Sequence, residues 1–141
     1  MNKKDSKIQF GLTFVLLRED SKILMQLRDD GNGKNILYPN MWTIPGGGQD
    51  AGESDVEGIV REIKEELDLE VLLSECEFIF EFMHDENVRD RVFLCRVKQD
   101  VKVELHEGAA IEWMTLADIK KLKLAFHSEE IIPTLEKILN K

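Results

Sequence analysis

Apolar residues recur at helical spacing between residues 55 and 67, and this stripe is the strongest secondary-structure signal along the chain. Its members lie three or four positions apart and would share one face of a helix: Val56, Ile59, Val60, Ile63 and Leu67. Ser54 and Glu57, three residues apart, form a capping-box pattern that marks where such a helix begins. The pattern therefore predicts a helix over residues 55–67 that buries one face.

Shorter apolar runs on both sides of this segment predict β-strands, which polar or glycine-containing turns separate. The predicted strands are residues 8–17, 22–28, 42–44, 77–84, 91–97 and 111–114, with residues 71–73 as a candidate edge strand. Residues 18–21 join the first two strands, residues 85–90 close a hairpin, and the composition of residues 29–40 indicates a loop. Pro45 and the glycines at 46–48 are expected to end the strand at 42–44.

Two further helices are predicted near the C-terminus, over residues 116–122 and 128–139. Pro133 either kinks the second of these helices or marks its true start. Several strands interrupted by few helices predict an α+β fold in which a mixed sheet lies between helices. The length of 141 residues suits a single domain over residues 1–141 with a sizeable core.

Three glutamates on the first predicted helix indicate chemistry, because Glu62, Glu65 and Glu66 fall at i, i+3 and i+4 and share one face. Carboxylates packed so closely repel one another, and no basic residue follows any of them at i+4. A solvated acidic face is the alternative interpretation. The glycine turn at residues 46–48 leads into this helix, and the combination favours a divalent-metal site with oxygen ligands.

The same segment resembles the Nudix box, the signature of Nudix hydrolases, which reads G-x5-E-x7-R-E-U-x-E-E-x-G-U with U an aliphatic residue. The residues that match its fixed positions are Gly47, Glu53, Arg61, Glu62, Ile63, Glu65, Glu66 and Leu69. Asp68 stands where the pattern has its last glycine, just past the helix in an expected left-handed conformation. Asp tolerates that conformation better than most residues, so the departure concerns the helix end more than the chemistry.

The resemblance implies an α/β/α sandwich and hydrolysis of the diphosphate bond in a nucleoside diphosphate linked to another group. It implies Mg²⁺ as the cofactor, for which Mn²⁺ can substitute, with water attacking phosphorus while the metal holds the phosphates. It makes metal ligands of Glu62, Glu65 and Glu66, with the carbonyl of Gly46 and the later loop acid Glu107 as additional ones.

The remaining site residues follow from the same resemblance. Arg61 and Glu53 would orient the loop and helix, and either Glu62 or Glu107 would act as the general base. Arg28 is either a phosphate-contacting group or a surface charge at a strand end. The other predicted substrate contacts, whose alternative is simple packing, are Gly47, Tyr38, Phe126 and His127.

The bulk properties narrow the class of partner. A formal net charge of −9 argues against sequence-independent binding to nucleic acid, whereas bound Mg²⁺ would reverse the local sign of the charge and attract a pyrophosphate.

No apolar stretch approaches the roughly 18 residues of a membrane span, and no hydrophobic signal core opens the chain, so a cytoplasmic location is expected. Cys76 and Cys95 are too few for a disulfide framework or zinc site and are interpreted as small buried residues.

Two rival functions remain at this point. A Nudix-fold sensor that binds a nucleotide without catalysis would be expected to have lost ligands from the acidic trio, and all three are present. A structural Ca²⁺ protein would be expected to carry a D-x-D-x-D-G loop, which the chain lacks. The small-molecule nucleotide substrate is not identified, because nucleoside triphosphates, nucleotide sugars, ADP-ribose and dinucleoside polyphosphates share the box. The oligomeric state, a homodimer included, also stays open.

Overall fold

The computed structural model describes residues 8–84, 87–106 and 108–140 of the chain. Its strands are β1 (Gln9–Arg18), β2 (Ile23–Leu27), β3 (Trp42–Thr43), β4 (Gly46–Gly48), β5 (Cys76–His84), β6 (Val88–Val97) and β7 (Ala110–Met114). All seven belong to one sheet, in which five strands follow the order β3-β2-β1-β6-β5, while β4 also pairs with β1 and β7 with β2. The sheet is mixed, since β1 and β6 run parallel and the other pairs run antiparallel.

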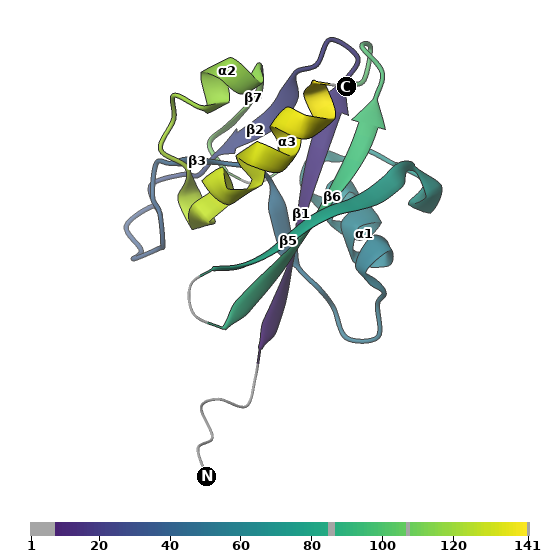
Figure 1. Ribbon diagram of the computed structural model, residues 1–141. Helices are drawn as coiled ribbons and strands as arrows, with labels where there is room; N and C mark the ends of the chain where they lie inside the picture. Colours follow the sequence, from purple (N-terminus) through teal and green to yellow (C-terminus); the bar gives the residue numbers. More distant parts are fainter. Residues whose placement is uncertain (1–7, 85–86, 107, 141) are drawn as a thin grey trace.

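Helices cover both faces of this sheet (Figure 1). They are α1 (Asp55–Leu67), α2 (Leu116–Ile119) and α3 (Ile132–Leu139), with two 3-10 helices, η2 (Leu73–Glu75) and η3 (Ala125–Ile131). Helix α1 lies on one side of the sheet, and α2 and α3 lie on the other. The prediction of an α+β sandwich with a mixed sheet between helices is therefore confirmed.

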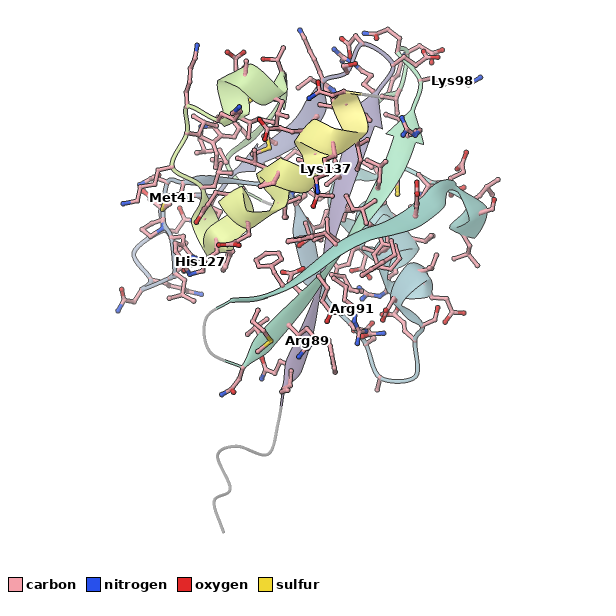
Figure 2. All side chains as sticks on the ribbon, in the orientation of Figure 1. Met41, Arg89, Arg91, Lys98, His127 and Lys137 are labelled. Carbon is pink, nitrogen blue, oxygen red and sulfur yellow. The ribbon has the colours of Figure 1, made fainter. Side chains whose placement is uncertain are left out.

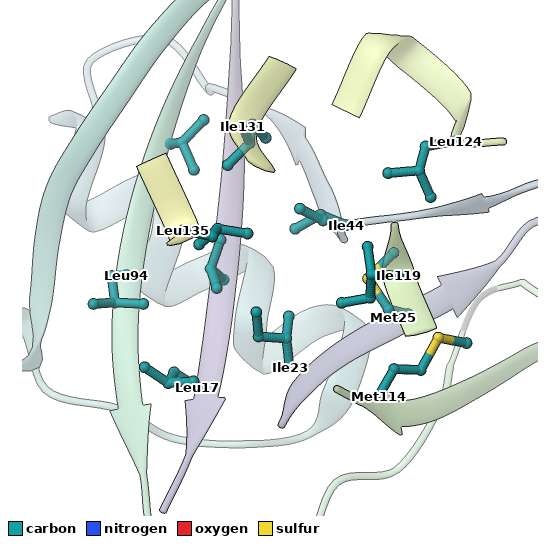
Figure 3. Close-up of a cluster of buried hydrophobic side chains, with 12 residues drawn as sticks. Leu17, Ile23, Met25, Ile44, Leu94, Met114, Ile119, Leu124, Ile131 and Leu135 are labelled. Carbon is teal, nitrogen blue, oxygen red and sulfur yellow. The ribbon is translucent and has the colours of Figure 1, made fainter. Parts of the chain in front are cut away.

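The two faces of β1 feed two separate hydrophobic clusters, as the alternation of side chains along a strand requires. Leu12, Phe14 and Leu16 pack with the apolar stripe of α1. Val15 and Leu17 face the other way and join the cluster beneath α2 and α3 (Figure 3). Helix α1 is thus fixed to the centre of the sheet, which holds its polar face in a defined place.

Local capping sets both ends of α1 at the predicted residues. The Ser54 side chain accepts from the Glu57 backbone N–H at 3.1 Å, and the Glu57 carboxylate accepts from the Ser54 N–H at 2.8 Å. Asp68 ends the helix in the left-handed region, with φ 54° and ψ 36°. Its backbone N–H donates to the Lys64 carbonyl, so this residue takes the conformation that a glycine would take at the same position.

Several predicted boundaries were wrong, mostly where pairing partners lie far apart in sequence. Residues 71–73 form no strand, and the 3-10 helix η2 begins at the last of them. The glycines at 46–48 continue as strand β4, because they pair with β1. Strand β6 starts at Val88 inside the predicted hairpin turn, and α2 ends at Ile119. Pro133 lies in the first turn of α3, so it marks the helix start.

In the described part of the chain, each helix is too short or too polar to span a bilayer.

Candidate active site

Strand β4 brings three glycines against β1 and α1, and two of them leave no room for a side chain. A Cβ atom on Gly46 would lie 2.3 Å from the carbonyl oxygen of Leu12. A Cβ atom on Gly47 would lie 2.3 Å from the carboxyl carbon of Glu62, whereas one on Gly48 would meet no described atom within 4 Å. The backbone of β4 therefore rests directly on the Glu62 carboxylate.

Arg61 ties the acidic face of α1 to the preceding loop. Its Nε and Nη2 donate to the two carboxylate oxygens of Glu53 at 2.6 and 2.9 Å, and Nη2 also donates to the Gly48 carbonyl at 2.8 Å. Its Nη1 donates to Glu62 and to Glu65, both at 3.1 Å. No basic residue lies four positions after any of the three glutamates. The relevant base precedes the glutamates, one residue before Glu62 and four before Glu65.

This pairing also sets the ionisation of both partners. Hydrogen bonds from Arg61, followed by one from the Asp50 backbone N–H, hold the pKa of Glu53 below its usual range. Contact with Glu53, and then with Glu62, raises the pKa of Arg61. Arg61 therefore stays charged and Glu53 stays ionised near neutral pH, and the loop remains fastened to the helix.

Buried polar groups concentrate at this end of the sheet. Seven polar or charged side chains are buried in the described part of the chain: Glu62 and Glu66 on α1, together with Thr13, Gln26, Thr43, Asp90 and Ser128. Glu65 differs from its two neighbours, since 60% of its side chain is exposed. A buried carboxylate is costly unless cations or hydrogen bonds compensate for the lost water, so two of them on one helix face need such compensation.

Of the three glutamates on this face, Glu66 lines a hollow rich in oxygen ligands, whereas Glu62 and Glu65 are not among the described residues that line it. Glu66 and Gly46 line this hollow together with five other residues: Gln26, Arg28, Asp29, Ile36 and Gly108. Carboxylate and carbonyl oxygens are the ligands that Mg²⁺ and Mn²⁺ favour, and no sulfur or imidazole is among the described residues of this hollow. Glu107, the predicted loop ligand, lies outside the described residues.

A second cavity of about 320 Å³ adjoins the hollow at Glu66 and Gly46 and shares Gln26, Arg28 and Gly46 with it. All five buried polar residues outside α1 line it, as do three aromatic rings: Phe10, Phe82 and Phe126. The volume is in the range of small-molecule sites, and apolar walls with a few polar groups are typical of them. The two hollows together can accept a molecule with a phosphate part and an organic part.

The structure separates the predicted substrate contacts. Arg28 lines both hollows, but its Nε and Nη2 donate to the Leu37 carbonyl at 3.1 and 2.9 Å, and its guanidinium lies 4.8 Å from the centre of the Phe126 ring. The ring of Tyr38 packs edge-on against the ring of Phe126, with 4.7 Å between the ring centres. Phe126 and Gly47 line the cavity, and among its described lining residues neither Tyr38 nor His127 is present.

His127 lies at an exposed position where the 29–40 loop approaches the start of η3 (Figure 2). Its Nδ1 is 3.7 Å from the Glu129 carboxylate. The roles assigned from the sequence to Tyr38, His127 and Arg28 stay predictions.

The buried polar residues that line the cavity were not predicted from the sequence. Thr13 donates from its hydroxyl to Asp90 Oδ1 at 2.7 Å, and the hydroxyl oxygens of Thr43 and Ser128 lie 3.2 Å apart. The one available signal was a threonine inside the apolar run of β1 and a glutamine inside that of β2, at Gln26. Isolated polar residues in buried strands indicate a partner or ligand.

Most of the chain is similar to proteins that are already known. Residues 8–135 match the family model described as the NUDIX domain. The mouse diphosphoinositol polyphosphate phosphohydrolase 3-alpha is 31% identical over 130 residues, which cover 90% of this chain and 74% of the relative. The RNA pyrophosphohydrolase of Pelagibacter ubique is 26% identical over 144 residues, covering 89% of this chain and 87% of the relative.

Solved structures show the same fold at lower identity. The NUDIX domain of Shewanella oneidensis NrtR in complex with ADP-ribose has a TM-score of 0.76 at 20% identity, covering 99% of this chain and 94% of that one. The MutT protein of Methanosarcina mazei has a TM-score of 0.76 at 17% identity, covering 96% of this chain and 99% of that one.

Proposed function

The chain belongs to the Nudix family of hydrolases, and on that premise we propose that it is a metal-dependent nucleotide pyrophosphohydrolase. Its substrate would be a nucleoside diphosphate linked to another group, cut at the diphosphate bond. The observation that carries the proposal is the acidic face of α1, where Glu62 and Glu66 are buried beside the glycine strand and Arg61 joins Glu62 to Glu65.

We assign the metal to the oxygen ligands of this face. Glu62, Glu65, Glu66 and the Gly46 carbonyl would hold Mg²⁺ or Mn²⁺, which, once bound, would polarise the phosphoryl oxygens and lower the pKa of water. Arg61 is a positioning residue, since its contacts run to other protein groups.

The reaction needs one bond formed and one broken. The oxygen of water bonds to phosphorus, the bridging P–O bond of the diphosphate breaks, and the bridging oxygen leaves on the departing phosphate group. A carboxylate takes the proton from water, and Glu62 and Glu107 are the two groups we propose for this step. The phosphates would occupy the hollow at Glu66 and Gly46, while the organic part would extend into the adjoining cavity.

The proposal is tested by phosphate and pyrophosphate release from a panel of nucleotides and nucleotide conjugates with Mg²⁺. The double variant Glu65→Gln, Glu66→Gln is the comparison, because it keeps the shape of both side chains and removes their charge. We expect turnover of one substrate class by the wild-type protein, and none by the variant or without metal. Turnover that survives both treatments would overturn the proposal.

A binding module without catalysis is the alternative. Such a module has no need for three metal ligands, and all three positions are glutamate here. Binding of a panel nucleotide with no metal-dependent turnover would support the module instead.

A further inference from the structure

Two cysteines outside the proposed active site lie opposite each other on neighbouring strands. Cys76 opens β5 and Cys95 lies near the end of β6, 19 positions later, and the antiparallel register pairs the two residues directly. Their sulfur atoms are 3.1 Å apart, and both thiols are free in this structure. Neither cysteine is among the described residues that line the two hollows of the active site.

The strand pairing places both side chains within reach of a disulfide. Residues directly opposite each other in an antiparallel pair have Cα atoms about 4.5 to 5.5 Å apart and side chains on the same face of the sheet. A disulfide joins Cα atoms that are about 4.4 to 6.8 Å apart, so the backbone needs no rearrangement. Closure would bring the sulfur atoms together by about 1 Å, from 3.1 Å to the disulfide bond length of about 2.05 Å.

The two thiols differ in exposure and in acidity. Cys76 is half-buried, whereas Cys95 is fully buried in the hydrophobic cluster beneath α1. A hydrogen bond from the Cys95 thiol lowers the pKa of Cys76, and the same contact, followed by burial, raises the pKa of Cys95. An oxidant from solvent therefore meets Cys76 first, as the more nucleophilic sulfur, with the protonated Cys95 thiol behind it.

A metal site is a poor alternative for this pair, because structural zinc takes a tetrahedral set of ligands. Among the described residues, one cluster of three ligating side chains occurs, and it includes neither cysteine: Asp68, Glu104 and His106. Oxidation is thus the chemistry that two sulfur atoms held this close can perform by themselves.

We propose that Cys76 and Cys95 are a modification site, at which hydrogen peroxide forms a reversible disulfide that fastens β5 to β6. The Cys76 thiolate attacks one peroxide oxygen, the O–O bond breaks, and Cys76 becomes a sulfenic acid while the other oxygen leaves as hydroxide. The Cys95 sulfur then attacks the Cys76 sulfur, the S–O bond breaks, and the thiol proton of Cys95 leaves with the hydroxyl group as water. The two thiols are oxidised, and the peroxide is reduced to water.

The bond would stabilise one edge of the sheet. Strand β5 is the last in the order β3-β2-β1-β6-β5, and Cys76 is its first residue, directly after the 3-10 helix η2. A disulfide stabilises a protein mainly by restricting the unfolded chain, and loops of this length give a typical gain. We expect the melting temperature to rise by about 6 to 12 °C when the bond forms.

The test treats the reduced wild-type protein with a slight excess of hydrogen peroxide and measures free thiols, intact mass and melting temperature. The chain has two cysteines, so both thiols should disappear, the mass should fall by that of two hydrogen atoms, and the melting temperature should rise. Dithiothreitol should reverse all three changes. Trypsin cuts after Arg89 and Arg91, between the two cysteines, so the disulfide should join two peptides that reduction separates.

Cys95→Ser and Cys76→Ser are the matched controls, since each keeps one thiol. Peroxide should add oxygen to Cys95→Ser without raising its melting temperature, and it should leave the buried thiol of Cys76→Ser intact. The oxidised and reduced forms of the wild-type protein test the proposal even if a variant fails to fold.

Four results in the wild-type protein would overturn the proposal: two persistent thiols, oxidation of Cys76 alone to a sulfinic acid, disulfide-linked dimers, or an oxidised form with an unchanged melting temperature. None of these measurements involves turnover or metal. The outcome is therefore independent of the proposed function.

Discussion

Gly47→Ala is the smallest change that should disable the proposed metal site. The added Cβ atom would lie 2.3 Å from the carboxyl carbon and one oxygen of Glu62, and 2.4 Å from the other oxygen. Non-bonded carbon atoms settle at about 3.5 to 4.0 Å, so the carboxylate or the glycine strand must move by about 1 Å. The Glu62 side chain cannot rotate freely, because one of its carboxylate oxygens accepts a hydrogen bond from Arg61 and only 11% of the Glu62 side chain is exposed.

A displacement of that size should cost far more activity than stability. Misplacement of a reacting group by about 1 Å can lower the rate by about 100-fold. Crowding by one methyl group costs about 1 kcal/mol or more, which corresponds to a fall of about 3 °C in melting temperature for a domain of this length. We therefore expect a folded protein whose kcat/KM for the substrate found in the panel is lower by about 100-fold.

Gly48→Ala provides the matched control, since a Cβ atom at this position would meet no described atom within 4 Å. Steady-state kinetics and thermal melting of the two variants and the wild-type protein complete the comparison. Equal activity in Gly47→Ala and Gly48→Ala would contradict this prediction, because it would mean that the position of the Glu62 carboxylate does not limit the reaction.

Three further predictions concern other parts of the molecule. Ser54→Ala should remove about 1 kcal/mol of stability through loss of the helix cap, seen as a melting temperature lower by about 3 °C. The pKa of Glu53 is lower in the folded protein than in the unfolded chain, where it is about 4.3. The ionised Glu53 therefore stabilises the fold at pH values above about 4.3, and this stabilisation is lost as the pH falls through the pKa of Glu53 in the folded protein. The melting temperature of the wild-type protein should thus exceed that of Glu53→Gln at neutral pH, with the gap closing in acid. A hydrogen bond from the Cys95 thiol lowers the pKa of Cys76, at a sulfur–sulfur distance of 3.1 Å. Alkylation of Cys76 near neutral pH should be slower in Cys95→Ala than in Cys95→Ser, which keeps a donor, and equal rates would contradict this cause.

The parts of the fold with local signals were predictable from sequence. The capping box, the apolar stripe and the left-handed end of α1 depend on residues within a few positions of one another, and both ends of the helix are where the pattern placed them. The acidic trio follows from the same helical period. Cys95 lies in a strand-like apolar run and is buried, as predicted, whereas Cys76 at the start of β5 is only half-buried.

The features that sequence reasoning missed depend on contacts between distant segments. Thr13 and Asp90 are 77 positions apart and meet only because β1 and β6 run in parallel, a pairing that no local pattern specifies. The same pairing extended β6 back to Val88 and moved Asp90 from an expected turn into the cavity wall. Phe126 and His127, with φ of 54° and 58°, are held in a left-handed conformation that their residue types do not predict.

The proposed metal site depends on the acidic face of α1, and Mn²⁺ binding to this face can be measured without any substrate. Electron paramagnetic resonance reports free Mn²⁺ during titration of the wild-type protein, of the double variant Glu62→Gln, Glu66→Gln, and of Glu77→Gln as an exposed control on β5. The proposed metal site requires saturable binding to the wild-type protein and the control, competition by Mg²⁺, and loss of binding in the double variant. Equal binding by all three proteins would contradict it, because the cation would then be held by groups other than these carboxylates.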